Sequence, residues 1–364
     1  MTVSINSASK KYGNKMQKTI ELAALDGSNG LNIFNFPEYR GRDLSVSNVG
    51  DFNGDGIDDI AFGKASSNQS YVIFGSDEVT AVNVSFSELN GSNGIIINGI
   101  DENDQSGFEI SHAGDINDDG VDDLIIGAPF ADGPHFSQAA AGRSYVIFGS
   151  TTWDSINLNL ADLNGSNGFE ITSPYPFGAH GWSVAGAGDL NGDNVSDLII
   201  GAPSSNANGE DSGAVVIVFG AANWTNASIK TGPSPRDTHL QLNLGEAYAD
   251  SGYSVSSAGD FNGDGLDDVI IGAPGEGKGY VIFGSSQGTS IEPTDKFEFF
   301  GGNRTGYSVS DAGDFNGDGI DDVIFGSRVR GAGENYVVFG SSDRVAQILN
   351  LDELDGLNGF KIVG

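Results

Sequence analysis

An acidic loop with the donor atoms of a metal site occurs five times in the sequence. Its first copy places aspartates at positions 51, 55, 58 and 59 and an asparagine at position 53. Like charges so close together repel one another unless a cation neutralises them. The five copies read GDFNGDGIDDIAFG (50–63), GDINDDGVDDLIIG (114–127), GDLNGDNVSDLIIG (188–201), GDFNGDGLDDVIIG (259–272) and GDFNGDGIDDVIFG (313–326).

Each loop offers one set of oxygen ligands, counted from its first aspartate as position 1. Positions 1, 3, 5 and 9 supply side-chain oxygens, position 7 supplies a backbone carbonyl, and glycine at position 6 permits a turn with positive φ. Position 12 is Phe or Ile instead of glutamate, so the chain leaves as a buried strand and the loop is not a helix–loop–helix calcium site. We predict about five Ca²⁺ ions, held by Asp51, Asn53, Asp55, Ile57, Asp59, Asp115, Asn117, Asp119, Val121, Asp123, Asp189, Asn191, Asp193, Val195, Asp197, Asp260, Asn262, Asp264, Leu266, Asp268, Asp314, Asn316, Asp318, Ile320 and Asp322.

The alternative is a set of Asp/Asn turns on an acidic surface. Five copies at a fixed distance from the following strand favour calcium, and Mg²⁺ fits less well because it requires a strict octahedron. The third loop has Asn194 at position 6 and Ser196 at position 8, so we expect a weaker site there. The aspartate at position 8 of the other loops is left out of the ligand set, because in a hairpin it can turn away and accept bonds from backbone donors.

Composition limits the classes of partner. The chain has 364 residues, a formal net charge of −33 and no cysteine, which excludes disulfides and thiolate sites. Such a charge repels nucleic acid and anionic membranes, and no apolar run is long enough to cross a membrane. Residues 1–18 form a polar, basic arm without the apolar core of a signal peptide. We expect a bacterial protein that is exported to the cell surface or beyond by another route.

The acidic loops belong to a longer repeat whose first aspartates lie 54 to 74 residues apart. Each unit holds about four short β-branched or aromatic segments bounded by Gly, Asn and Asp, which is typical of a propeller blade. A solenoid has shorter coils, and an ordinary β-sandwich does not explain the repetition. We predict an all-β fold in which residues 19–364 form one propeller of about five four-stranded blades.

One strand is left over in this count. LDGSNGLNIF (25–34) and LDGLNGFKIV (354–363) both match the outer strand of a unit, and a closed ring needs only one of them. A blade whose outer place is filled by one of them leaves the other unpaired, and an unpaired strand edge seeks a partner. The sequence therefore predicts a surplus outer strand, with self-association by strand addition as its consequence. The alternative is that the chain is cut from a longer array of units.

The repeat resembles the FG-GAP repeat of integrin α-subunit propellers and their bacterial relatives. The GAP element stands at 127–129, 201–203 and 272–274, and the FG element at 107–108, 181–182, 252–253 and 306–307 with varied aromatics. The first unit has Asp43-Leu44 in place of FG. The resemblance implies a β-propeller with Ca²⁺ on one face and partners on the opposite face. Animal members have seven blades, so an integrin mechanism of cell adhesion does not carry over directly.

The sequence shows no catalytic constellation. Its four histidines form no zinc motif, no G-x-S-x-G element stands between a strand and a helix, and most acid pairs are assigned to calcium. We therefore expect a non-enzymatic structural or adhesion module. The alternatives are a carbohydrate-binding lectin and an accessory domain of a polysaccharide-active enzyme.

Two loops on the face opposite the calcium loops could bind a ligand. They are APFADGPHFSQAAAGRS (128–144) and SPYPFGAHGW (173–182), and exposed aromatic rings beside polar groups suit protein or sugar recognition. The candidate ligand-binding residues are Phe130, His135, Phe136, Tyr175, Phe177 and His180. The alternative is that these rings pack the two loops on each other. Trp153 and Trp224, at equivalent places on the calcium side, are predicted to be structural.

Overall fold

The computed structural model describes residues 44–77, 83–133, 139–153, 155–232, 238–286, 296–302, 304–328, 333–343 and 348–363, and the backbone of three short strands before them. The basic arm (1–18) lies outside the described residues, except that β1 (Val3–Ser4) pairs with β2 (Thr19–Ile20). In the described part, regular structure consists of strands and short 3-10 turns. No helix there combines the length and hydrophobicity needed to cross a membrane.

Five antiparallel sheets form the body of the molecule, and each is one blade whose four strands pair in chain order. The prediction of an all-β fold with about five four-stranded blades is confirmed. Blade 1 is β4 (Leu44–Asn48), β5 (Ile60–Lys64), β6 (Gln69–Ile73) and β8 (Gly94–Asn98); blade 2 is β9 (Glu109–Gly114), β10 (Asp123–Ala128), β11 (Arg143–Ile147) and β13 (Gly168–Thr172); blade 3 is β14 (Ser183–Gly188), β15 (Asp197–Ala202), β16 (Ala214–Val218) and β18 (His239–Leu242); blade 4 is β19 (Ser254–Gly259), β20 (Asp268–Ala273), β21 (Lys278–Ile282) and β22 (Lys296–Phe300); blade 5 is β23 (Thr305–Gly313), β24 (Asp322–Ser327), β25 (Glu334–Val338) and β27 (Gly359–Val363).

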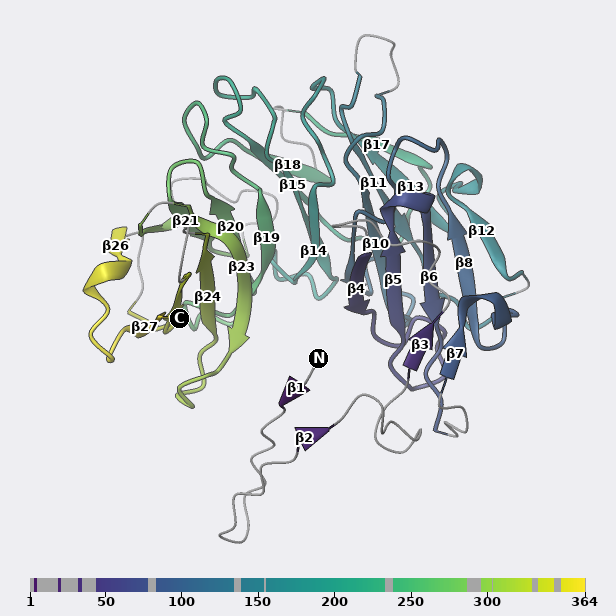
Figure 1. The fold of residues 1–364 in the computed structure, drawn as a ribbon, viewed down its shortest axis with the longest axis horizontal. Helices are drawn as coiled ribbons and strands as arrows, with labels where there is room; N and C mark the ends of the chain where they lie inside the picture. The colour runs from purple at the N-terminus through teal and green to yellow at the C-terminus, as the bar shows by residue number, and fades with distance from the viewer. Residues whose placement is uncertain are drawn as a thin grey trace, which may run out of the picture.

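The blades follow one another around an arc, with their first strands on its inner side (Figure 1). Strand β4 lies beside β9, β9 beside β14, β14 beside β19, and β19 beside β23. Blades 1 and 5 stand at the two ends of this arc, apart from each other (Figure 1). Among the described residues, each of these two blades therefore has one broad face that no other blade covers.

Apolar clusters between successive blades hold the arc together. The cluster between blades 1 and 2, for example, contains Ala61, Val72 and Ile95 from one side and Leu124, Ile126 and Tyr145 from the other. A blade in the middle of the arc is buried on both faces, which explains why β10, β15 and β20 are continuous apolar runs without polar alternation. Most of the hydrophobic stabilisation is thus made between units instead of within them.

Short strands tie neighbouring blades together, and we call them straps. Strap β12 (Asn157–Asn159) pairs in parallel with β8 of blade 1, β17 (Ser228–Lys230) with β13 of blade 2, and β26 (Ile348–Asn350) with β22 of blade 4. Strap β7 (Asn83–Ser85) pairs in the same way with β3 (Asn32–Phe34), which belongs to none of the five blades. Strand β3 is the predicted surplus outer strand, and β27 completes blade 5. The expectation that one of the two is unpaired is wrong, because β7 pairs with β3 and β25 with β27.

The glycines of the FG and GAP elements meet at the junctions between blades. A Cβ added to Gly127 would overlap the carbonyl oxygen of Gly181 in the next blade, and Gly63, Gly201 and Gly272 meet Gly107, Gly252 and Gly306 in the same way. The FG glycines also have φ values between +82° and +88°. Only glycine combines this backbone conformation with so close an approach.

Candidate functional site

The five acidic loops connect the first and second strands of each blade, and a common hydrogen-bond pattern shapes them. In the first loop the carboxylate of Asp51 accepts the N–H groups of Asp55 and Gly56, each at 2.8 Å. Asp55 in turn accepts the N–H of Ile57 at 3.0 Å. The same bonds recur in the other four loops. They turn the aspartates inward and leave the carbonyl at position 7 free of the loop's own bonds.

Position 6 adopts the left-handed backbone conformation that the sequence predicts, with φ between +66° and +91° in all five loops. Asn194 has φ +66° in the third loop, so that loop keeps the turn with a side chain that tolerates it less well than glycine. Position 4 is also left-handed, which sequence analysis missed. In the second loop it is Asp118 with φ +57°, so the second loop carries the same kind of local strain as the third.

The aspartates at position 9 are fully buried at the base of the loops. One oxygen of Asp59 accepts the N–H of Gly75 at 2.7 Å, and the other accepts that of Asn53 at 3.1 Å. Burial, and then the neighbouring carboxylates at positions 1 and 5, raise their pKa values against the opposing effect of these N–H bonds. The pKa is raised to about 6 for Asp59, about 8 for Asp123, about 7 for Asp197 and about 8 for Asp268, and it is also raised for Asp322.

The residues of each loop fit a calcium ion by their chemistry, because all the donors are oxygens. Among the described residues, no three His, Asp or Glu side chains converge closely enough to hold a metal alone, so each loop also depends on Asn and backbone oxygens. Asn117 at position 3 of the second loop has a buried side-chain oxygen without a hydrogen-bond partner. A desolvated oxygen of this kind, in the same loop as the buried carboxyl group of Asp123, suits a cation.

The aspartate at position 8 links neighbouring blades. Asp122 accepts the N–H of Asp51 in the preceding loop at 2.8 Å, and Asp267 and Asp321 accept those of Asp189 and Asp260 at 2.7 and 3.0 Å. The expectation that this side chain bonds backbone donors is confirmed at these three junctions. Trp153 stacks on Phe52 of the first loop, and the indole of Trp224 donates to the carbonyl of Ile116, so both tryptophans are structural, as the sequence predicts.

The two loops of the expected ligand face lie at the opposite end of the blades and bond to each other. Phe177 N–H donates to the carbonyl of Ala139 at 2.9 Å, and His180 N–H to that of Ala141 at 3.0 Å. Phe177 is 65% exposed and Phe130 38%, whereas Tyr175 is half-buried. His135 and Phe136 lie outside the described residues. His180 is fully buried and its burial lowers its pKa to about 3, so its expected place on the exposed face is wrong.

His180 is buried because of its place in the repeat. It directly precedes the FG glycine, where blades 2, 4 and 5 have Ser106, Ser251 and Thr305, and all four side chains lie inside the junction.

Tyr248 is the counterpart of Phe177 at the next junction, and sequence analysis did not identify it. Both residues stand four positions before an FG glycine, both have positive φ (+66° and +58°), and Tyr248 is 59% exposed. Tyr248 N–H donates to the carbonyl of Glu210 at 2.7 Å, as Phe177 does to Ala139. Positive φ is unfavourable for a bulky residue, so the surrounding loops must hold these two exposed aromatic residues in this conformation. Their distance from the FG glycine is the signal that could have found them.

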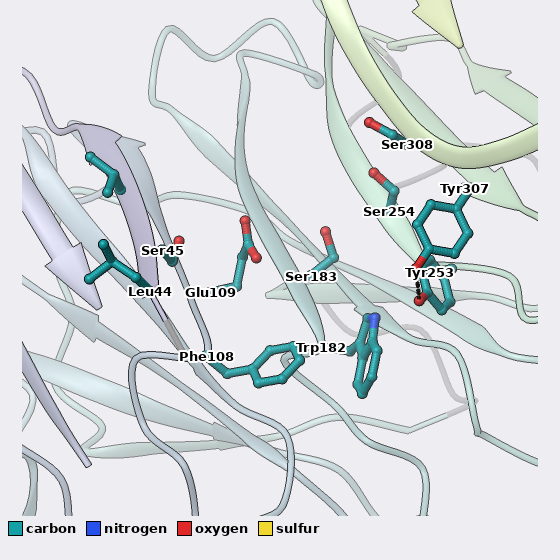
Figure 2. Close-up of a pocket in the computed structure, with 11 residues that line it drawn as sticks. Leu44, Ser45, Phe108, Glu109, Trp182, Ser183, Tyr253, Ser254, Tyr307 and Ser308 are labelled. Carbon is teal, nitrogen blue, oxygen red and sulfur yellow. Dashed lines mark hydrogen bonds between the residues drawn. The ribbon is translucent and has the colours of Figure 1, made fainter. Parts of the chain in front are cut away.

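A row of aromatic rings lines a cavity of about 440 Å³ on the inner side of the arc (Figure 2). The rings are the aromatics of the FG elements. The distances between ring centroids are 4.8 Å from Phe108 to Trp182, 5.6 Å from Trp182 to Tyr253 and 4.8 Å from Tyr253 to Tyr307. Glu109 also lines this cavity, at a position where the other blades have Ser45, Ser183, Ser254 and Ser308. The sequence contained these aromatics but gave no reason to place them around one hollow.

Comparison with known proteins identifies the repeat. The model of the FG-GAP repeat matches residues 109–147, 180–218 and 251–289, which cover most of blades 2 and 3 and the first three strands of blade 4. The chain carries FG-GAP repeats. The resemblance noted from the sequence is thereby confirmed, and the five-bladed all-β architecture of the chain is consistent with a propeller-like fold.

Curated relatives of this chain include integrin α chains. It is 28% identical over 246 residues to integrin alpha pat-2 of Caenorhabditis briggsae, which covers 64% of this chain and 18% of the relative. It is 29% identical over 258 residues to integrin alpha-5 of Xenopus laevis, covering 67% and 21%. It is also 34% identical over 171 residues to phosphatidylinositol-glycan-specific phospholipase D of Bos taurus, covering 45% and 18%. The chain spans about a fifth of the length of these relatives.

Proposed function

We propose that this chain is a calcium-stabilised binding module that acts outside the cell in adhesion and does not catalyse a reaction. The observation that carries the proposal is the separation of two sets of groups. Five oxygen-donor loops occupy one end of the blades, and the exposed rings of Phe177 and Tyr248 occupy the other. A rigid scaffold that presents a few exposed aromatic side chains suits recognition of a protein surface.

Calcium in this proposal stabilises the binding face indirectly. The residues at positions 1, 3, 5 and 9 and the carbonyl at position 7 would hold the ion, which supplies positive charge to neutralise the clustered carboxylates. The loops also carry the bonds between blades, as between Asp122 and Asp51. Holding the loops in place would therefore hold the blades, and with them Phe177 and Tyr248, in a fixed arrangement.

The partner we infer is an extracellular protein with basic groups. Tyr248 donates to Glu210 at 2.5 Å, and Glu276 accepts the N–H of Glu246 nearby, so the exposed ring stands among carboxylates. Charge of one sign favours a partner of the other sign. A glycan is the alternative, because aromatic rings also stack on sugars. The accessory-domain alternative has support only from the relative named as a phospholipase D.

Self-association through strand addition is the second part of the proposal. The observation that favours it is the apolar surface at both ends of the arc, where Phe315 of blade 5 is 61% exposed and Val46 of blade 1 is 55% exposed. Exposed apolar surface of this kind is typical of an interface.

The calcium part is tested by titrating CaCl₂ into chelator-treated protein in a calorimeter and counting bound metal. We expect about five ions per chain, in line with one oxygen-donor set per loop. Absence of binding heat together with an unchanged melting curve would overturn it.

The binding part is tested on arrays of extracellular proteins and of glycans, with the labelled chain in CaCl₂. The expected result is binding to basic proteins that weakens in the Phe177→Ser and Tyr248→Ser variants at unchanged melting temperature. Binding to glycans alone would replace the proposal by the lectin alternative. Ser87→Ala is the matched surface control, because it lies on an exposed turn away from this face.

A further inference from the structure

The two exposed faces of the arc match the two sides of an interior junction. On the side that faces the preceding blade, Val46 and Ile60 of blade 1 are 55% and 41% exposed. Their equivalents are buried in the other four blades: Ile110, Val184, Val255 and Val309 for the first, and Leu124, Leu198, Val269 and Val323 for the second. Blade 1 thus presents the surface that blades 2 to 5 bury against a preceding blade.

Blade 5 presents the opposite surface. Phe315 at position 2 of its acidic loop is 61% exposed, whereas Phe52, Ile116, Leu190 and Phe261 at the same position are fully buried. Ile362 of β27 is 43% exposed, whereas its equivalents Ile97 and Ile171 are buried. Among the described strands, none pairs with the outer edge of β27, although β8, β13 and β22 each carry a strap there.

The segment that contains β3 resembles in sequence the outer strand β27 of blade 5. In the sequence, G-L-N-I-F (30–34) contains β3 (Asn32–Phe34) and G-F-K-I-V (359–363) is β27, and each follows L-D-G-x-N. Ile33 of β3 stands opposite Val84 of strap β7, in the register in which Ile97 of β8 stands opposite Leu158 of strap β12. By this equivalence Ile362 of β27 would stand opposite Val84. Strand β3 therefore occupies on β7 the place of an outer strand whose own blade is not among the five.

We propose that β27 of one copy of this chain pairs with strap β7 of a second copy, and that β3 caps β7 until it is displaced. The proposal rests on the self-association proposed above and names its surfaces. Blade 5 of the first copy then packs on blade 1 of the second, which covers Phe315 and Ile362 on one side and Val46 and Ile60 on the other. The contact is head-to-tail, so it leaves one face of each kind free and can propagate into a filament.

Groups that form hydrogen bonds at the interior junctions also stand at this contact. Ser45, Ser183 and Ser254 each accept an N–H from the inner strand of the next blade at 3.1 Å, and Ser308 of blade 5 stands at the equivalent place and is exposed. Asp58 of blade 1 stands where Asp122, Asp267 and Asp321 accept the N–H of the preceding loop. In the sequence, blade 1 has Asp43 where the other blades have the FG glycine, so we place the contact on the straps and outer strands.

The test uses paired cysteine variants of the full chain, which has no cysteine of its own. Val84→Cys and Ile362→Cys proteins are mixed in CaCl₂ and oxidised glutathione. A disulfide-linked heterodimer is the expected product, because the two Cβ atoms would face each other across adjacent strands. Val84→Cys mixed with Lys361→Cys is the matched control, since neighbouring residues of a strand point to opposite faces.

The capping role of β3 is tested with Ile33→Pro in the Val84→Cys protein, because proline disrupts strand pairing. If β3 covers β7 in about nine-tenths of the molecules, releasing it raises the apparent affinity about tenfold. An equal or lower yield of heterodimer overturns the capping role. Association seen by light scattering without the Val84–Ile362 crosslink overturns the β7–β27 pairing but leaves self-association standing, and a strictly monomeric chain overturns both.

Discussion

The acidic loops of blades 4 and 5 have almost the same sequence in different surroundings. GDFNGDGLDDVIIG and GDFNGDGIDDVIFG differ at two of fourteen positions. Their internal bonds agree closely: Asp264 N–H donates to Asp260 at 2.9 Å, and Asp318 N–H donates to Asp314 at 2.9 Å. Phe261 is nevertheless fully buried, whereas Phe315 is 61% exposed. The shape of the loop is local, and the burial of its side chains depends on the neighbouring blade.

The bonds between loops show the same difference. Asp260 N–H donates to Asp321 of the next blade, and the carbonyl of Phe261 accepts the N–H of Ser341. The loop of blade 5 has no following blade in this structure that could supply such groups. An interior loop is thus part of a junction between two blades. The loop of blade 5, among the described residues, is held by contacts within its own blade.

Removal of calcium should have the largest effect, because it acts on all five loops at once. A ligand that binds only the folded state stabilises it by about 2.7 kcal/mol per site at a hundredfold excess over Kd. We expect chelator to lower the Tm strongly, Ca²⁺ to restore it and Mg²⁺ to restore it poorly. Calorimetric scans measure this, and equal rescue by both cations would contradict the proposed selectivity.

The stability of the chelated protein should fall as the pH rises. In the folded state the pKa of Asp123 and of Asp268 is about 8, above the ordinary value of 3.8, so each protonated carboxyl stabilises the fold at low pH. That contribution is complete below about pH 4 and is lost as the pH rises towards about 8. In saturating Ca²⁺ the ionised form is the bound form, and the fall should disappear. Melting curves across this range in chelator and in Ca²⁺ test the difference.

Replacing the phenylalanine at position 2 by alanine should cost much more stability in the interior loop than in the exposed loop. Phe261→Ala should cost about 3–5 kcal/mol, because it leaves a cavity between blades 4 and 5. Phe315→Ala removes a ring that is already largely in solvent and should cost about 0.5 kcal/mol or less. Denaturant unfolding of the full chain in Ca²⁺ measures both values. Equal costs would mean that Phe315 is covered in solution, as in the head-to-tail contact.

The aspartate at position 8 offers a smaller contrast. Asp321→Ala leaves the partly buried N–H of Asp260 without its carboxylate acceptor and should cost about 1–3 kcal/mol. Asp58→Ala removes only a 3.3 Å bond from the side chain of Asn48 on the surface, and its effect should lie within about 0.5 kcal/mol. Urea unfolding of the two variants decides the matter. A larger loss for Asp58 would show that blade 1 has a partner.

The smallest effect is expected at position 6 of the third loop. Asn194→Gly relieves a left-handed backbone at φ +66° and should strengthen the fold by roughly 0.5–1 kcal/mol. The reverse change, Gly265→Asn, should weaken the fourth loop by a similar amount. A Cβ at Gly265 would meet no atom within 4 Å, so only the backbone conformation is tested. Loss of stability in Asn194→Gly would show that its side chain makes a contact that outweighs the strain.

The sequence alone determined the repeat, the all-β class, the five acidic loops and the left-handed turn at position 6. These features depend on groups within about a dozen residues of one another, where residue type and spacing decide which bonds can form. The structural role of Trp153 and Trp224 also followed from the sequence, because both stand at the same place in their units.

Only the tertiary structure decided which surfaces are covered. His180 has the sequence context of an exposed loop but is buried, because the next residue, Gly181, packs against Gly127 of the preceding blade. The row from Phe108 to Tyr307, the pairing of β3 with β7 and the exposure of Phe315 likewise depend on contacts between segments about 50 or more residues apart in the chain. No local pattern records such contacts, since one repeat sequence suits both an interior blade and a blade at the end of the arc.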